Sequence, residues 1–313
     1  MPEWLIERGI GETRAALVED GAIVEARILL DGVVRAGTVL DAQLKLTGVP
    51  AVALADGVEY LLPAGAPGVT QGAALQIEIT REAIPGAEPW KRPLARASDQ
   101  SPCIPPPLAG RDIAFTAHNH LDDAGWDDLV EQARSGIVDF ADGTLRLSPA
   151  PAMTLIDVDG TLPPADLAVA GAAAAAQAIR RLDIGGSIGI DLPTVAGKAP
   201  RLAAAAAIDA HLPRPFERTA VNGFGFIQIV RPRCRASLLD IWSDRSGAEA
   251  RALLRRAARS GSGARRLAAH PGVIAVLESH PDWLDALARQ LGGAVGLRAD
   301  PALPISAGHA EPA

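Results

Sequence analysis

The sequence predicts a multidomain α+β protein, in which an N-terminal OB-like β-barrel precedes a mixed α/β domain and a small α/β appendix at the C-terminal end. Three patterns predict it. Short alternating segments bounded by turn residues recur about every ten residues early in the chain, which is typical of a small barrel. Strand-like and helix-like segments then alternate through residues 144–240, which is typical of a layered α/β structure. A shorter alternation follows.

The first strands are divided between two predicted regions. Residues 1–24 alternate between apolar and polar positions and contain glycine turns, so we expect strands that pack on the central α/β domain. Residues 25–98 are predicted to form the OB-like barrel. Tyr60 is the only aromatic residue between positions 25 and 83.

Residues 99–142 are predicted to be a linker followed by a helix. Proline is frequent in residues 84–110, which is typical of an extended connecting segment. Asp122 near the start and Gly136 at the end delimit an expected helix over residues 118–136.

The central domain is expected over residues 143–240. Its predicted elements, in order, are two strands within 144–158, a helix over 165–182, a strand over 187–191, a helix over 201–211 and a strand over 225–230. Asp157 and Asp191 end two strands that a helix connects. If these strands are parallel neighbours, both carboxylates lie at the carboxyl edge of the sheet, where α/β proteins form their sites.

The C-terminal region, residues 241–313, is expected to be a small α/β domain with a disordered tail. The predicted elements are a helix over 247–260, a strand over 273–276, a helix over 281–290 and a strand over 294–298. The last ten or so residues are expected to be disordered because terminal segments often are.

The segment around Asp157 and Asp159 carries the clearest chemical signal. Alternate residues of a strand face the same side, so the two carboxylates lie side by side while Val158 turns into the core. Such oxygen ligands suit Mg²⁺ or Mn²⁺. The segment fits the Asp-x-Asp-Gly-Thr signature of haloacid-dehalogenase-like phosphatases, and it also fits the metal-binding strand of a ribonuclease. A solvated strand end before an Asp-Gly turn is the plainer alternative.

Charge is unevenly distributed along a chain whose formal net charge is −7. Residues 201–270 contain 13 Arg and no Lys against 5 acidic residues, a local excess of eight positive charges. Such a region suits a polyanion, although solvated helix faces give the same pattern. The start of the chain lacks an apolar leader and no apolar run is long enough to span a bilayer, so we expect a cytoplasmic protein. Cys103 and Cys234 form no ligand pair, so no zinc is expected.

The order of these motifs resembles the ribonuclease E/G family in a short form. The likeness is carried by Gly143–Asp159, Ala178–Asp191, Asn222–Arg233 and the N-terminal barrel, which is similar to the RNA-binding OB-fold domain of that family. The resemblance implies a Mg²⁺-dependent endoribonuclease that hydrolyses single-stranded RNA, with Mn²⁺ as an alternative ion. Residues 143–240 would be its catalytic domain.

The resemblance also implies the site residues. Asp157 and Asp191 match metal ligands. Asp159 stands where the family has Asn, and it would be a third catalytic residue that binds the metal or positions its water. The Arg residues after the last central strand would hold the RNA backbone, and a lysine and an aromatic residue would add contacts: Arg231, Arg233, Arg235, Lys198 and Tyr60. Their phosphate contacts would make affinity fall with salt.

Several family features are absent from this sequence. Thr194 replaces a second acid near Asp191, and Leu61 stands about where an RNA-stacking Phe is expected. The cysteine zinc-link that joins family protomers is missing. A homo-oligomer is therefore possible only through other contacts. Residues 99–142 are too short for a complete 5′-phosphate sensor.

Two other functions stay open. A non-catalytic RNA-binding relative would keep the scaffold without cleavage. A haloacid-dehalogenase-like phosphatase would use Asp157 as a nucleophile, but no later apolar strand ending in the required acidic motif follows Lys198. Metal-dependent cleavage of labelled RNA separates these possibilities.

Overall fold

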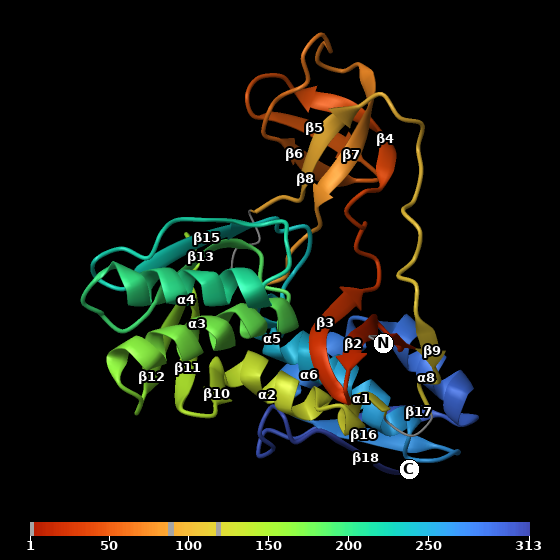
Figure 1. Cartoon of the computed structure of the whole chain (residues 1–313). Coiled ribbons are helices and arrows are strands. Elements are labelled where there is room, and N and C mark those ends of the chain that lie inside the picture. The colour runs from red at the N-terminus through yellow and green to blue at the C-terminus, as the bar shows by residue number, and fades with distance from the viewer. Residues whose placement is uncertain (1–2, 87–90, 117–119) are drawn as a thin grey trace. The chain divides into compact units, whose positions relative to one another are not determined.

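The structure is a computed structural model that describes residues 3–86, 91–116 and 120–313. It has the mixed α+β composition that the sequence predicts, with a closed five-stranded barrel (Figure 1). The chain divides into two compact units. Unit 1 comprises Met1–Asp31, Ala109–Asp127 and Ile241–Ala313, and unit 2 comprises Gly32–Leu108 and Asp128–Asp240.

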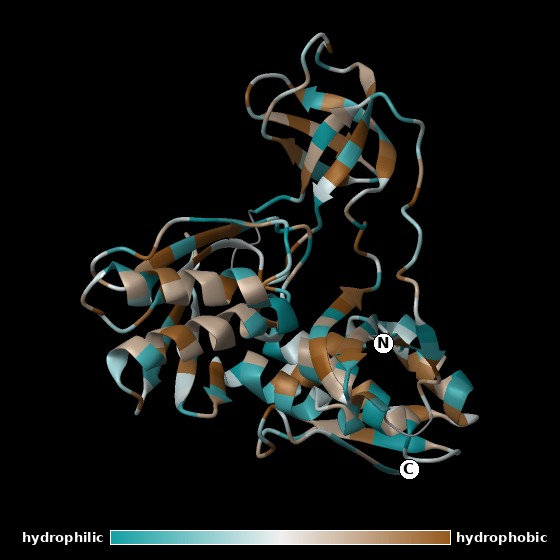
Figure 2. Ribbon diagram, in the orientation of Figure 1, coloured by the Kyte–Doolittle hydropathy of each residue, from teal (hydrophilic) through white to brown (hydrophobic). Residues whose placement is uncertain are grey.

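The barrel belongs to unit 2. Its strands, in closed order, are β4 (Val39–Leu46), β5 (Ala51–Ala55), β6 (Val58–Leu62), β8 (Leu94–Ser98) and β7 (Ala74–Arg81). Polar and apolar residues alternate along the strands (Figure 2), so that every second side chain enters the core, where Leu44, Leu62 and Ile77 are fully buried. The expected start at residue 25 was wrong, because residues 25–30 lie in β3 (Ala22–Leu30) of another sheet.

The other sheet of unit 2 has six strands. Their order is β10 (Ile137–Phe140), β11 (Gly143–Pro149), β12 (Thr154–Gly160), β13 (Gly186–Asp191), β15 (Phe226–Arg231) and β14 (Glu217–Arg218). Strands β12 and β13 are parallel, and the other neighbours are antiparallel. The crossover between them is α3 (Pro164–Arg181), an Ala-rich helix that begins with Pro164.

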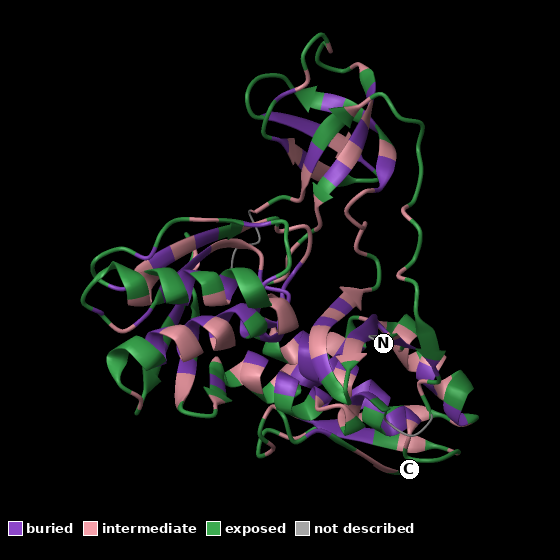
Figure 3. Ribbon diagram, viewed as in Figure 1, coloured by how far each residue is buried: buried purple, intermediate pink, exposed green. Residues whose placement is uncertain are grey.

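Helix α3 packs on one face of this sheet. A Cβ on Gly171 of α3 would lie 2.3 Å from Cγ1 of Val158, so glycine is what allows the helix to approach β12. Helix α4 (Lys198–His211) packs against α3, and its outer side is largely exposed (Figure 3). Ile156, Val158 and Ile190 are buried on the helix side.

Unit 1 combines the two ends of the chain. One sheet has the order β3, β2 (Glu12–Glu19), β1 (Glu3–Arg8) and β9 (Arg111–Ile113). A second has the order β17 (Val295–Ala299), β16 (Arg265–Ala269) and β18 (His309–Pro312). Its helices are α1 (His120–Asp123), α6 (Arg245–Ala258), α7 (Pro271–Glu278) and α8 (Pro281–Leu291). The N-terminal strands therefore share a compact unit with the C-terminal region, and not with the central domain as expected.

Three local predictions in unit 1 and at its edges need correction. Residues 273–276 lie in helix α7 and not in a strand, because Pro271 starts a helix and the His270 side chain caps it by accepting from Gly272 N at 3.1 Å. The tail is ordered: β18 pairs antiparallel with β16. The single helix expected over residues 118–136 is two helices, α1 and α2 (Trp126–Ser135), and its first two positions lie outside the described residues.

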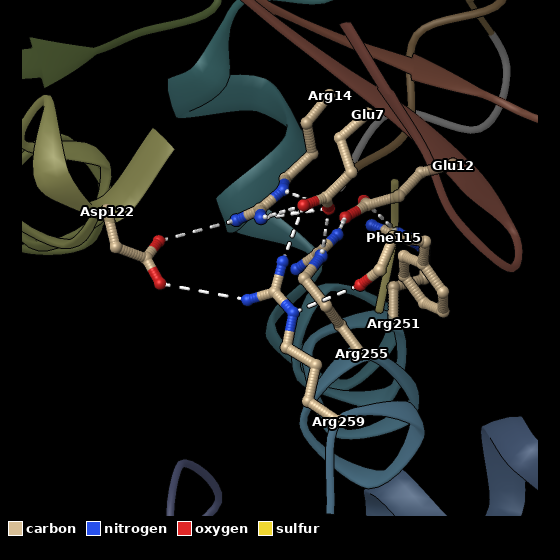
Figure 4. Close-up of polar contacts among 8 residues, drawn as sticks. All are labelled: Glu7, Glu12, Arg14, Phe115, Asp122, Arg251, Arg255 and Arg259. Carbon is tan, nitrogen blue, oxygen red and sulfur yellow. Dashed lines mark hydrogen bonds and ion pairs between the residues drawn. The ribbon is translucent and has the colours of Figure 1, made fainter. Parts of the chain in front are cut away.

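A buried charge network joins β1 and β2 to α6 (Figure 4). Glu7, only 1% exposed, accepts from Arg14 Nε at 3.0 Å and from Arg255 Nε at 2.9 Å. Glu12 accepts from Arg251 Nε at 2.8 Å and also pairs with Arg255. Residues more than two hundred positions apart are thus tied together by charge-assisted hydrogen bonds.

The network extends to two further residues, Arg259 and Asp122. Arg259 donates to Glu7 and, at 3.0 Å, to the Phe115 carbonyl, and it lies 3.8 Å from Asp122. Burial alone would raise the pKa of Glu12, but the charges of Arg255, Arg251 and Arg14 outweigh it and hold that pKa below its usual value. Burial, joined by the Arg255 charge, lowers the pKa of Arg14 to about 10. The network is therefore a structural clamp between the chain ends.

Candidate functional site

The candidate site is built on the parallel pair β12–β13. Asp157 and Asp191 are direct register partners across this pair, so their side chains leave the same face of the sheet. Both are exposed. Helix α3 carries the chain back to start β13 beside β12, so the two strands are parallel neighbours, which was the condition on which the sequence predicted the site. Asp191 ends β13 as expected, whereas β12 continues past Asp157 to Gly160.

Alternation along β12 sets which groups face which side. Ile156 and Val158 enter the core on the helix side, while Leu155, Asp157 and Asp159 project from the opposite face and are exposed. We call this opposite side the open face. It carries exposed or half-buried residues of three adjacent strands, β12, β13 and β15.

Asp159 lies close to a basic residue, Arg146. Its Oδ2 lies 3.8 Å from Nε of Arg146, and both side chains are more than 60% exposed. Arg146 is also the register partner of Asp157 across β11–β12. A cation therefore lies beside the carboxylates on the open face, a feature that the sequence reasoning missed because nothing in the local pattern around position 146 signals it.

The donor set suits a hard divalent ion bound through few protein ligands. Across the parts of the chain that the structure describes, no group of three or more His, Cys, Asp or Glu residues could hold a metal ion. Two carboxylates on neighbouring strands nevertheless fit Mg²⁺, which keeps several waters and takes one or two carboxylates. The residues that would hold it are Asp157 and Asp191.

Aromatic residues border this pair. Phe226 is the register partner of Asp191 across β13–β15. Its ring lies above Gly189, where a Cβ would meet Phe226 Cζ at 2.5 Å and Leu155 Cδ2 at 3.1 Å. Phe224, two residues earlier, is 82% exposed. The sequence contains the signal, since both aromatics lead into the strand after Asp191, but their exposure is visible only in the structure.

The three predicted RNA-binding arginines lie at the other end of the sheet. Arg231 is the register partner of Gly186, at the start of β13, so antiparallel β15 carries it away from Asp191 by about 16 Å. Arg235 donates to Asp183 at 2.8 Å, and Arg233 donates to Asp240 at 2.9 Å. The arginines line a cavity of about 180 Å³ together with Cys234. The structure does not bring them to the carboxylates.

The two remaining predicted residues have opposite environments. Lys198 is the exposed first residue of α4 and lines a groove of about 360 Å³ with Arg201, Leu202 and Val221. Tyr60 is only 2% exposed in the barrel core, and burial raises its pKa. The structure does not support the prediction that Tyr60 contacts RNA, because its side chain in β6 points into the barrel core.

Comparison of the chain with protein-family models and with curated proteins finds no match. Among the described residues, no helix has the length and hydropathy needed to cross a bilayer. The assignment of the open face therefore rests on its geometry and chemistry.

Proposed function

We propose that the protein is a metal-dependent endoribonuclease that hydrolyses phosphodiester bonds in single-stranded RNA at the open face. The observation that carries the proposal is the register pairing of Asp157 with Asp191, the last pair of the parallel ladder between β12 and β13. Two exposed carboxylates side by side suit Mg²⁺, which takes one or two carboxylates and keeps several waters. The family resemblance of the surrounding sequence supplies the substrate class.

Each residue of the site has a chemical role in this proposal. Asp157 and Asp191 hold the ion, Mg²⁺ or alternatively Mn²⁺, which when bound supplies an activated water and charge neutralisation at the phosphate. Asp159, two residues beyond Asp157 on the same face, orients the attacking water by accepting a hydrogen bond. Arg146 offsets the negative charge of the carboxylates and keeps Asp159 directed along the strand.

The barrel has a supporting role as an OB-like RNA-binding module. Its closed five-stranded architecture is shared with that class of fold. Among the described barrel residues the one aromatic is Tyr60, and its ring is buried, so no base can stack on it. Binding there would depend on backbone contacts and on basic residues.

The test is cleavage of an end-labelled single-stranded RNA with Mg²⁺ or Mn²⁺. The parent should give shorter products, and Asp157→Asn and Asp191→Asn should each lose at least about 100-fold in rate, because each removes a ligand of the ion. Asp128→Asn, which changes an exposed carboxylate on α2, is the matched control and should cleave normally. If all three variants cleave RNA at the same rate as the parent, the assignment of the site to Asp157 and Asp191 is wrong.

A second candidate function is a non-catalytic RNA-binding protein. It is favoured by Arg146, whose guanidinium lies 3.8 Å from Asp159 and can compete with a metal ion for the carboxylates of the open face. RNA that is bound but stays intact with either ion would establish this alternative. Release of phosphate from p-nitrophenyl phosphate, lost in Asp157→Asn, would instead identify a phosphatase.

A further inference from the structure

The loop before β15 holds an aromatic side chain outward beside the candidate site. The Asn222 side chain accepts hydrogen bonds from the backbone N of Phe224 at 2.9 Å and of Phe226 at 3.0 Å. The Asn222 N–H donates to the Phe226 carbonyl at 2.9 Å. The turn is therefore fixed by its own hydrogen bonds, and the direction of Phe224 is set by the backbone.

This loop is also anchored to the chain immediately after Asp191. Gly225 has φ +92°, and a Cβ there would lie 2.2 Å from the Leu192 carbonyl oxygen. Only glycine combines this backbone conformation with so close an approach. The Thr194 hydroxyl donates to the Phe224 carbonyl at 3.0 Å. Phe224 is thus positioned from the same segment that carries Asp191.

Phe224 has no role in the core. At 82% exposure it forgoes the stabilisation that burial gives a phenyl ring. An aromatic ring that is exposed on an ordered turn, with the turn hydrogen-bonded to the segment after Asp191, is suited to stack on a base.

Two basic residues of α4, Arg201 and Lys198, lie near this loop. Nη1 of Arg201 is 3.8 Å from the position of a Cβ on Gly223, and Arg201 Nε donates to the Gly197 carbonyl at 2.9 Å. Lys198 is exposed nearby, at the start of the same helix, and lines the same groove. The loop therefore combines an exposed aromatic ring with a nearby arginine, and its backbone is hydrogen-bonded to the segment that follows Asp191.

We propose that Phe224 is a base-stacking platform for the single strand whose phosphate lies at Asp157 and Asp191, and that Arg201 and Lys198 hold the next part of its backbone. The proposal rests on the proposed function for the identity of the ligand. It places recognition of the base on the sheet domain itself, where the described barrel lacks an exposed aromatic. An exposed ring suits a base, and the basic residues beside its loop suit a phosphate of the same strand.

The experiment measures binding without cleavage. Fluorescence anisotropy of a labelled oligouridine, in EDTA, is compared with that of an abasic ribose-phosphate oligomer of equal length. Phe224→Ala should weaken oligouridine binding about 5- to 100-fold, as loss of one stacked base does, and leave binding of the abasic oligomer unchanged. Phe224→Trp should retain binding. Ile104→Ala, which removes an equally exposed apolar side chain, is the matched control and should bind both normally.

The cations are tested by salt dependence. Arg201→Gln should weaken binding of both oligomers and reduce the slope of log affinity against log salt by about one. Equal weakening of both oligomers by Phe224→Ala, or no weakening of either, would overturn the stacking platform, even in a parent that cleaves RNA. If Phe224→Ala shows the base-dependent loss of binding but the parent never cleaves RNA, the stacking platform is supported and the proposed nuclease activity is wrong.

Discussion

Asp157 lies directly opposite Asp191 in the last pair of the parallel ladder between β12 and β13, and both carboxylates are exposed. An ion held by both carboxylates would bind the folded state, in which the two are side by side, and not the unfolded chain. The proposed metal site can therefore be tested by stability as well as by activity.

Divalent ions should therefore stabilise the protein. At a Mg²⁺ concentration 100 times its dissociation constant, the free energy of unfolding should rise by about 2.7 kcal/mol. The gain is measured as a rise in melting temperature that EDTA reverses. The double variant Asp157→Asn/Asp191→Asn should lose this rise, since it has no carboxylate at either position. Asp128→Asn should keep it. A rise that survives in the double variant would place the ion elsewhere.

Acid should destabilise unit 1 through its buried network. The folded-state pKa of Glu12 is lowered, so this carboxylate contributes stability above its ordinary pKa of 4.5, and the contribution is lost as pH falls through the lowered value. Glu12→Gln should remove about 3–5 kcal/mol at neutral pH, because it leaves Arg251 and Arg255 short of a partner.

The measurement is denaturant unfolding between pH 7 and pH 3. The variant should show a flatter pH dependence than the parent over the acid range. Glu19→Gln, at the exposed end of the same strand, is the control and should behave like the parent. A variant as stable as the parent at neutral pH would show that the network does not support unit 1.

Much of the fold could be predicted from local patterns. The Ala-rich run that becomes α3 has strong helix propensity, and the alternation around Asp157 fixes which carboxylates share a face. Asp157 and Asp191 were expected together on the condition that their strands are parallel neighbours, and the structure meets that condition.

The predictions that failed either overlooked a local helix-start signal or depend on long-range contacts. The apolar run at residues 273–276 has the composition of a strand, but Pro271 and the His270 cap start a helix there. Residues 25–30 alternate as a barrel strand would, yet they pair with β2. Tyr60 alternates correctly, but the sequence does not show which side of the strand is the barrel interior. Exposure, which distinguishes Phe224 from Tyr60, is a property of the tertiary structure.

Close packing of α3 on β12 gives a stability prediction. Gly171→Ala would place its Cβ 2.3 Å from Val158 Cγ1, so helix and strand must separate, at an expected cost of about 1–3 kcal/mol despite the better helix propensity of alanine. Gly296→Ala is the control: a Cβ there meets nothing within 4 Å, and its stability should match the parent. Thermal unfolding of both variants measures the difference. If Gly171→Ala unfolds at the same temperature as the parent, α3 and β12 separate without a cost in stability, and the prediction is wrong.

The arginines after β15 should act on stability and not on RNA affinity. Arg235 donates to Asp183 at 2.8 Å, and the two side chains are 24% and 10% exposed, so Arg235→Gln leaves a largely buried carboxylate with fewer donors. The expected cost is about 1–3 kcal/mol in the free energy of unfolding. Arg201→Gln, in contrast, should leave the unfolding free energy unchanged and lower RNA affinity. Denaturant unfolding and salt-dependent binding of the two variants separate these roles. A reduced salt slope with unchanged stability in Arg235→Gln would instead place the RNA backbone at the cavity beside Cys234.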